Sequence, residues 1–208
     1  MDAGTHRYLS HRSFKLSLPL QYTVLLFSTL TTVAFLKVQV GTHRMHHKYV
    51  DTDLDPQNSR IVGWLGLYCN MFVNKQGVSD QFKFFIRDSL RDKVVEFYDK
   101  NYVAVLLGYV LLLLLIDPYL VLFAYIVPAG YCLHTLGIVN CLIHRWGYKN
   151  YHDRAGDSRN SVALAILTLG ANGWHNNHHA NASDWQHGKK KWEIDPTSLI
   201  IRMIKNDQ

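Results

Sequence analysis

Residues 102–116 read YVAVLLGYVLLLLLI and carry no charged side chain. As a helix, these 15 residues span about 22 Å at about 1.5 Å per residue, which is short of the roughly 30 Å hydrocarbon core of a bilayer. Crossing therefore needs upstream residues or a thinner bilayer. Asp117 and Pro118 then break the helix, and residues 119–143 contain no Asp, Glu, Lys or Arg. The two segments predict a transmembrane hairpin over about 102–143 with both ends on one side. A buried core hairpin in a soluble protein is the alternative.

The composition supports one domain that lies partly in lipid. The chain has 208 residues, of which 48% are hydrophobic and 18% charged, and its net charge is +6. A basic face of this kind suits anionic lipid headgroups or an acidic electron carrier. Nucleic-acid binding is disfavoured because the basic residues are scattered between long apolar runs. Three cysteines without a C-x-x-C spacing exclude a disulfide framework and a zinc ribbon.

Four further segments have a helical or apolar pattern. Residues 16–36 are mostly apolar and uncharged, and residues 78–100 show apolar side chains at helical spacing, which predicts an amphipathic helix. Residues 161–169 and the segment after Pro196 predict two more short helices.

Histidine is the unusual residue, with 12 in the chain. Nine of them form four groups, which are an H-x-x-x-x-H pair, two H-x-x-H-H boxes and one single residue. In that order the groups are His6 and His11; His43, His46 and His47; His175, His178 and His179; and His144.

The spacing favours a site with two metal ions. On a helix, i+3 and i+4 lie near the face of residue i, so each H-x-x-H-H box directs three imidazoles toward one region. An i+5 pair is rotated by roughly 140°, so we expect His6 and His11 to contact two different ions. Nine imidazoles exceed the needs of one zinc, whereas two metals with four or five ligands each fit the number. Imidazole binds Fe, Zn, Cu and Ni, so the ligand type does not select iron.

Each group also has an ordinary interpretation. A single histidine such as His144 at a helix end is more often a satisfied polar residue, and His6 and His11 alone fit a basic surface turn. Two H-x-x-H-H boxes in one chain favour metal binding. His134, His152 and His187 lie outside any box and are expected to be ordinary polar residues, although His134 lies in an apolar helix, where a titratable group is a functional candidate.

These boxes and their flanks resemble the membrane fatty acid desaturase family, in its Δ9 acyl branch of stearoyl-CoA-type and acyl-lipid enzymes. The matching stretches follow the family's order over nearly the whole chain. They are HRYLSHRSFK at 6–15, HRMHHKYVDTDLDPQNSR at 43–60, NCLIHRWGY at 140–148, DSRNS at 157–161, GWHNNHHA at 173–180 and WEIDPTSLIIR at 192–202.

The resemblance implies that the nine grouped histidines hold two iron ions, with Asn140 reaching one iron through water. It also implies O₂-dependent removal of two hydrogens from adjacent methylenes of a fatty acyl chain, with water as the other product. Electrons would come from a separate ferredoxin or cytochrome b5, and the acyl carrier is CoA, acyl-carrier protein or a lipid. Because zinc outcompetes ferrous iron for nitrogen ligands, recombinant protein is expected to contain some zinc. A hydroxylase on the same scaffold and a truncated, non-catalytic membrane metal protein are the alternatives.

The predicted fold is therefore an all-α, multi-pass integral membrane protein. One desaturase domain fills 1–208, with the hairpin at about 102–143 and a cytoplasmic, histidine-rich cap formed by 1–100 and 144–208. If residues 16–36 crossed the bilayer, His11 and His43 would face opposite sides and could not share a centre. We expect this stretch to lie at the interface or in the cap.

Several positions depart from the family pattern. The family has a membrane hairpin before the first box, whereas Met1 precedes His6 by five residues, so we expect part of the acyl-tunnel wall to be absent or to come from another chain. Ala171-Asn172-Gly173 replaces the usual Gly-Glu-Gly, which removes an expected carboxylate behind a ligand. Gly137 replaces a tryptophan near the acyl bend, which could shift the double bond. The residues after Gly63-Trp64-Leu65 are uncharged, so a CoA carrier is not assumed.

Overall fold

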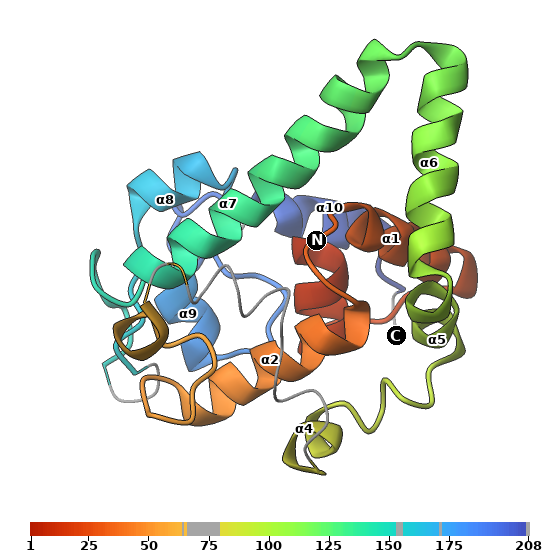
Figure 1. The fold of residues 1–208 in the computed structure, drawn as a ribbon. Coiled ribbons are helices and arrows are strands. Elements are labelled where there is room, and N and C mark those ends of the chain that lie inside the picture. Colours follow the sequence, from red (N-terminus) through yellow and green to blue (C-terminus); the bar gives the residue numbers. More distant parts are fainter. Residues whose placement is uncertain (64, 66–79, 153–155, 171, 207–208) are drawn as a thin grey trace.

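The fold is a helical cap from which one helical hairpin projects (Figure 1). The computed structural model describes residues 1–63, 65, 80–152, 156–170 and 172–206. Within these ranges there is no β-strand, only isolated bridges that join Tyr148 to Asn160 and Asn160 to Trp174. The prediction of an all-α chain is confirmed. In chain order the elements are the π-helix η1 (Asp2–Ser10), α1 (Leu18–Leu30), α2 (Leu36–Tyr49), α4 (Asp80–Phe85), α5 (Lys93–Lys100), α6 (Tyr102–Ile116), the π-helix η2 (Val121–Ile126), α7 (Val127–Leu142), α8 (Val162–Leu167), α9 (His175–Ala180) and α10 (Pro196–Ile204).

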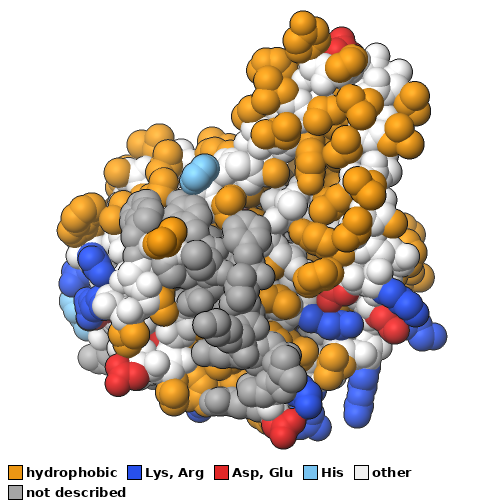
Figure 2. All heavy atoms as spheres, in the orientation of Figure 1, with side chains coloured by type: hydrophobic (Ala, Val, Ile, Leu, Met, Phe, Trp, Pro, Cys, Tyr) orange, Lys and Arg blue, Asp and Glu red, His pale blue; other side chains and the backbone are white. Residues whose placement is uncertain are grey.

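The projecting hairpin consists of α6, η2 and α7, as the apolar runs predict. Its two arms meet where the Tyr109 hydroxyl donates a hydrogen bond to the Ala124 carbonyl at 3.2 Å. Hydrophobic side chains cover its surface (Figure 2), and Leu113 is the buried residue of α6. Among the described residues, the helix Val121–Leu142 is long and apolar enough to cross a membrane, and α5 with α6 would form a second span bent by 67°.

The apolar stretch at 16–36 does not form a spanning helix. Its helix α1 has 13 residues and is therefore about 20 Å long at about 1.5 Å per residue. The chain then turns at Thr32, where φ is +58°, and α2 begins at Leu36. The Asp99 carboxylate accepts hydrogen bonds from the backbone amides of Leu36 and Lys37, at 2.7 and 3.2 Å, and so caps α2. The expectation that this stretch keeps both flanking histidine groups on one side is confirmed.

The main core holds α2 in place against η1, α4 and α5. Leu25, Leu36 and Val95 are each 0% exposed in this core. A Cβ on Gly41 of α2 would lie 2.3 Å from the Phe82 ring, so glycine permits the close approach of α4. The packing fixes the helix that carries His43, His46 and His47.

The amphipathic segment predicted as one helix over 78–100 is, in its described part, two helices, so that prediction was wrong. The carboxylate of Asp92 accepts hydrogen bonds from the amides of Val94 and Val95 and starts α5 as a new helix. Helical spacing of apolar residues does not reveal such an internal cap. Asp80 is the first residue of α4, and residues 78–79 lie outside the described ranges.

Candidate metal centre

The histidine side chains of the cap converge in two groups that could each hold a metal ion. Within each group the ligand nitrogens all lie within 4.8 Å of one another. The five-histidine group comprises His6, His11, His43, His47 and His178, and the four-histidine group comprises His46, His144, His175 and His179. All nine grouped histidines of the sequence therefore lie in one of two neighbouring clusters.

The rings meet through their Nε2 atoms. In the five-histidine group, Nε2 of His6 lies 3.0 Å from Nε2 of His178, and Nε2 of His11 lies 2.7 Å from Nε2 of His43. In the four-histidine group, the Nε2 of His175 is 3.2 Å from that of His144. A common orientation of this kind presents one lone pair from each ring to a shared centre.

Each H-x-x-H-H box contributes to both groups. On α2, the i and i+4 residues His43 and His47 belong to the five-histidine group, and the i+3 residue His46 belongs to the other. On α9 the roles are reversed, because the i+3 residue His178 joins the five-histidine group. The 3.6-residue repeat places i and i+4 on slightly different faces from i+3, so one short helix can serve two adjacent ions.

The expectation that His6 and His11 contact different ions was wrong. Both belong to the five-histidine group, and their ring centroids are 5.1 Å apart. The reason is that η1 is a π-helix, in which the His11 amide donates to the His6 carbonyl at 3.2 Å. The wider turn places i and i+5 on one face, and such segments occur frequently at functional sites.

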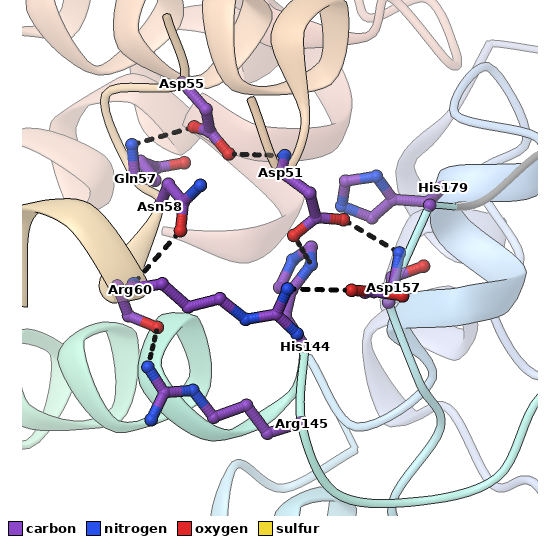
Figure 3. Close-up of polar contacts among 12 residues, drawn as sticks. Asp51, Asp55, Gln57, Asn58, Arg60, His144, Arg145, Asp157 and His179 are labelled. Atoms are coloured by element: carbon purple, nitrogen blue, oxygen red, sulfur yellow. Dashed lines mark hydrogen bonds and ion pairs between the residues drawn. The ribbon is translucent and has the colours of Figure 1, made fainter. Parts of the chain in front are cut away.

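Three of the rings have a carboxylate oxygen beside Nδ1. The Nδ1 of His6 lies 2.6 Å from Asp2, that of His46 lies 2.9 Å from Asp55, and that of His144 lies 3.1 Å from Asp51. Figure 3 shows the Asp51 and Asp55 side of this arrangement. A carboxylate at Nδ1 fixes the tautomer and raises the basicity of Nε2.

The family pattern led us to expect a carboxylate at Ala171-Asn172-Gly173, of which Ala171 lies outside the described residues. The carboxylates that lie beside the rings are close to the boxes in the chain, since Asp51 and Asp55 come soon after the end of α2 at Tyr49 and Asp2 lies four residues before His6. No metal-ligand spacing marks them, so the sequence reasoning missed them.

A buried ion pair supports the Asp2 side of the centre. Arg7 is 0% exposed, and its guanidinium lies 2.8 Å from Asp2 and donates to both carboxylate oxygens of Asp195, at 2.7 and 3.0 Å. Burial opposes ionisation of Asp2, but the Arg7 charge and the hydrogen bond from His6 outweigh it and hold the pKa of Asp2 well below its usual range. Asp2 is therefore an anion beside the five-histidine group.

Asp51 has a different set of partners. Burial raises its pKa, but the His144 ring and the backbone amide of Asp157, which donates at 2.8 Å, lower it to about 2. Asp55 accepts from the amides of Asp51 and Gln57, at 3.1 and 2.8 Å (Figure 3). Both carboxylates beside the four-histidine group are thus held by backbone donors rather than by a buried arginine.

Burial favours the neutral form of several of the clustered rings. Burial lowers the pKa of His43, His47 and His179 well below the ordinary value, and repulsion from neighbouring rings lowers each further. The pKa of His144 is also lowered by burial, against the opposing effect of Asp51. Neutral imidazole is the form that binds divalent metals.

His187 is a tenth histidine beside the centre. It was expected to be an ordinary polar residue, yet it is 2% exposed and its ring centroid lies 4.4 Å from that of His178. Its Nε2 is buried and has no hydrogen-bond partner among the described residues. It does not belong to either ligand group. His134 and His152 are exposed and lie outside both groups, as the ordinary interpretation expects.

A cavity of about 190 Å³ reaches the centre from the side of the hairpin. Its walls come from the loop between α1 and α2, from α7 and from the histidine groups, including Val33, Tyr131, His6, His43 and His175. Asn140, which is 7% exposed, lines this cavity and also a small space beside His46 and His144. The cavity can therefore bring an apolar chain beside both groups.

The family model for fatty acid desaturases matches residues 2–197. The chain belongs to the fatty acid desaturase family. The sequence resemblance to this family is thereby confirmed, and with it the assignment to a class of oxidoreductases.

Several relatives of this family member are named as desaturases. The sn-1 stearoyl-lipid 9-desaturase of Anabaena variabilis is 33% identical over 97% of this chain and 74% of the relative. That of Synechocystis sp. is 34% identical over 97% of this chain and 63% of its own length. The stearoyl-CoA desaturase of Capra hircus is 30% identical over 97% of the chain and 58% of its own length. The chain thus spans less than two thirds of the latter two.

Proposed function

We propose that this chain holds two iron ions between its nine grouped histidines and introduces a double bond, of Δ9 type, into a fatty acyl chain. The single observation that carries the proposal is the pair of imidazole groups at the end of an apolar-walled cavity. The relatives named stearoyl-lipid 9-desaturase support the position of the bond. The alternative functions are a hydroxylase on the same scaffold and a non-catalytic metal protein.

The donor set fits iron. All nine candidate donors are imidazole nitrogens, which bind ferrous iron as well as zinc, and geometry rather than affinity selects between them. Asp2 and Asp55 fix the tautomer of His6 and His46, so that Nε2 and not Nδ1 would face the metal, and Asp51 lies on the Nδ1 side of His144. We also propose that Asn140, at the junction of cavity and four-histidine group, orients a water toward one ion. Iron, when bound, would supply the activation of O₂ and the removal of two hydrogens from the acyl chain.

The protein's own contribution is to bind the acyl chain and to exclude water. Val33, Val139 and Leu136 line the cavity with apolar surface, whereas the two histidine groups close its inner end. An acyl chain held there would present its methylenes beside the Nε2 atoms. We infer an acyl-lipid as the first candidate carrier, with acyl-CoA and acyl-carrier protein as the other two. The segment at 66–69 on which the CoA expectation rests lies outside the described residues.

The membrane topology is part of the proposal. The hairpin of α6, η2 and α7 would cross the bilayer twice, which leaves both halves of the cap on the cytoplasmic side in one domain over 1–208. The exposed apolar surface of both arms supports this arrangement. Two electrons per double bond would reach the centre from a separate ferredoxin or cytochrome b5.

Expression in a host without Δ9 desaturase activity tests the proposal. The wild-type chain, supplied with iron and a ferredoxin with its reductase, is expected to produce monounsaturated chains in the lipid extract. His144→Ala removes a grouped ring and should abolish them, whereas His152→Ala, at an exposed histidine outside both groups, should not. An oxygenated product would indicate the hydroxylase. If the chain binds two metals but forms no product with either ferredoxin or cytochrome b5 as the electron donor, it is the non-catalytic protein.

A further inference from the structure

Two short helices of the cap expose an apolar surface. We call it the α8–α10 face, and it consists of α8, the turn after it, Ile194 and the outer side of α10. Its exposed apolar side chains are Val162, Ile166, Leu167, Leu169, Ile194, Leu199, Ile200 and Met203. Ile166 is 74% and Met203 is 85% exposed. Contiguous apolar patches of this kind mark an interaction site rather than ordinary solvent-facing surface.

The segments that flank the two helices pack together. A Cβ on Gly170, just after α8, would lie 2.3 Å from Pro196, the first residue of α10, and the φ of Gly170 is +81°. The indole of Trp174 donates to the Ile194 carbonyl at 2.8 Å. The apolar residues of α8 and α10 therefore cannot turn away from each other without breaking buried contacts.

This face lies at the base of the projecting hairpin. The Tyr131 hydroxyl of α7 donates to the carbonyl of Leu167, the last residue of α8, at 2.5 Å. In Figure 1, α8, α10 and α1 lie at the height where the hairpin leaves the cap, and α4 lies at the far end.

An aromatic pair lies at the base of the other arm of the hairpin, where α6 begins. The ring of Phe35, which is exposed, lies 4.6 Å from that of Tyr102. Aromatic side chains at this level suit the boundary between hydrocarbon and headgroups. Arg202 is an exposed basic side chain on α10 itself, and a positive charge there suits anionic headgroups.

We propose that the α8–α10 face lies in the cytoplasmic membrane interface and contacts the acyl chains of bilayer lipid. The inference rests on the proposed membrane hairpin and adds a second, in-plane area of lipid contact to it. Its continuity with the hairpin through Tyr131 favours lipid over a second copy of the chain. Tyr131 and Thr168, which follows α8, also line the acyl cavity. The lipid-facing wall and the substrate cavity therefore share residues, which would allow a lipid-borne acyl chain to enter sideways from the bilayer.

Photo-crosslinking from single positions tests the proposal. The photoreactive residue p-benzoylphenylalanine is placed at Ile166, Leu199 or Met203, and the purified, metal-loaded chain is reconstituted into 3:1 phosphatidylcholine–phosphatidylglycerol vesicles. Leu115, 77% exposed on α6, is the hairpin control, and Phe84, 64% exposed on α4, is the cap control with similar exposure. Adducts are identified by mass after irradiation. Metal content equal to that of the wild type shows that each variant is folded.

Ile166, Leu199 and Met203 are expected to form phospholipid adducts at a yield near that of Leu115 and roughly tenfold above that of Phe84. Adducts between two copies of the chain at these positions, or lipid yields no higher than at Phe84, would overturn the inference. If Leu115 itself forms no lipid adduct, the proposed membrane hairpin fails. If Leu115 reacts with lipid and the three test positions do not, only the α8–α10 face fails. Neither readout depends on desaturation.

Discussion

The two histidine groups offer the same ligand chemistry in different electrostatic surroundings. The four-histidine group has two carboxylates behind its rings, Asp51 and Asp55, and backbone amides hold both. The five-histidine group has one, Asp2, whose charge is partly offset by the buried Arg7, which also pairs with Asp195. Ring number favours metal binding at the five-histidine group, and uncompensated negative charge favours it at the four-histidine group. The comparison shows that the residues behind the rings, as well as the number of rings, distinguish the two neighbouring groups.

The largest difference is expected when one ring is removed from each group. His46→Ala leaves three rings in its group, and His178→Ala leaves four in the other. Because four nitrogen ligands suffice for a closed site and three leave it open, we expect His46→Ala to lose about one metal per chain. His178→Ala should keep both metals with weaker affinity. Metal analysis of the purified variants, counting iron and zinc together, measures this. If both variants lost the same amount of metal, the number of rings in each group would not explain how tightly that group holds its metal.

The next largest effect is expected for the free energy of unfolding when the buried Arg7, beside the five-histidine group, is replaced. Arg7→Gln leaves the carboxylates of Asp2 and Asp195 buried without their cation, which should cost about 3–5 kcal/mol in the free energy of unfolding. Arg12→Gln is the control, because Arg12 is exposed and its ion pair with Asp88 lies near the surface, where such pairs contribute about 0–1 kcal/mol. Denaturant unfolding of the metal-free protein in one detergent compares the two. Similar losses for both variants would show that the Arg7 pair is not a structural requirement.

The carboxylates behind the rings should affect metal affinity without changing ring number. Asp55→Asn retains an acceptor but removes the charge beside His46, so the four-histidine site should weaken by roughly 10–100-fold. Asp2→Asn should weaken the five-histidine site less, since Arg7 already offsets part of the Asp2 charge. Asp53→Asn, at an exposed position nearby, is the control. Cobalt titration against a competing chelator gives both affinities, and a larger effect from Asp2→Asn would reverse the comparison.

The smallest effect is expected at His187. Its Nε2 has no hydrogen-bond partner in the described part of the chain, so we expect the side chain to support the five-histidine group by packing against His178. His187→Phe keeps a ring of similar shape and should leave the affinity of that site within about twofold. His187→Ala opens a space beside His178 and should lower the affinity by roughly fivefold, equivalent to about 1 kcal/mol. The same cobalt titration distinguishes them. A large loss in His187→Phe would mean that the imidazole nitrogens matter.

Spacing in the sequence predicted the parts of the centre that lie on regular helices. The boxes at 43–47 and 175–179 obey the 3.6-residue repeat, and their rings converge as expected. The topology of residues 16–36 also followed from the sequence, because His11 and His43 had to lie on one side. Charge-free apolar runs predicted the hairpin by length and composition.

The remaining features depend on contacts that no local spacing encodes. The π-helical turn between His6 and His11 is a choice of backbone that the α-helical repeat does not anticipate. Asp2, Asp51 and Asp55 are ordinary loop or helix-end carboxylates until folding places them beside a ring. His187 lies outside any box, and only the packing of the segment between α9 and α10 brings it to His178.

The wide turn of η1 constrains how this centre can change through evolution or design. The carbonyl of His6 accepts the amide of the residue five positions later, so four intervening residues are part of the coordination geometry. An α-helical backbone over the same residues would rotate the second imidazole by roughly 140° and out of the cluster, even though both histidines would remain in the chain. An engineer who transplants this metal site into a new scaffold would therefore have to copy an under-wound backbone together with the donor atoms.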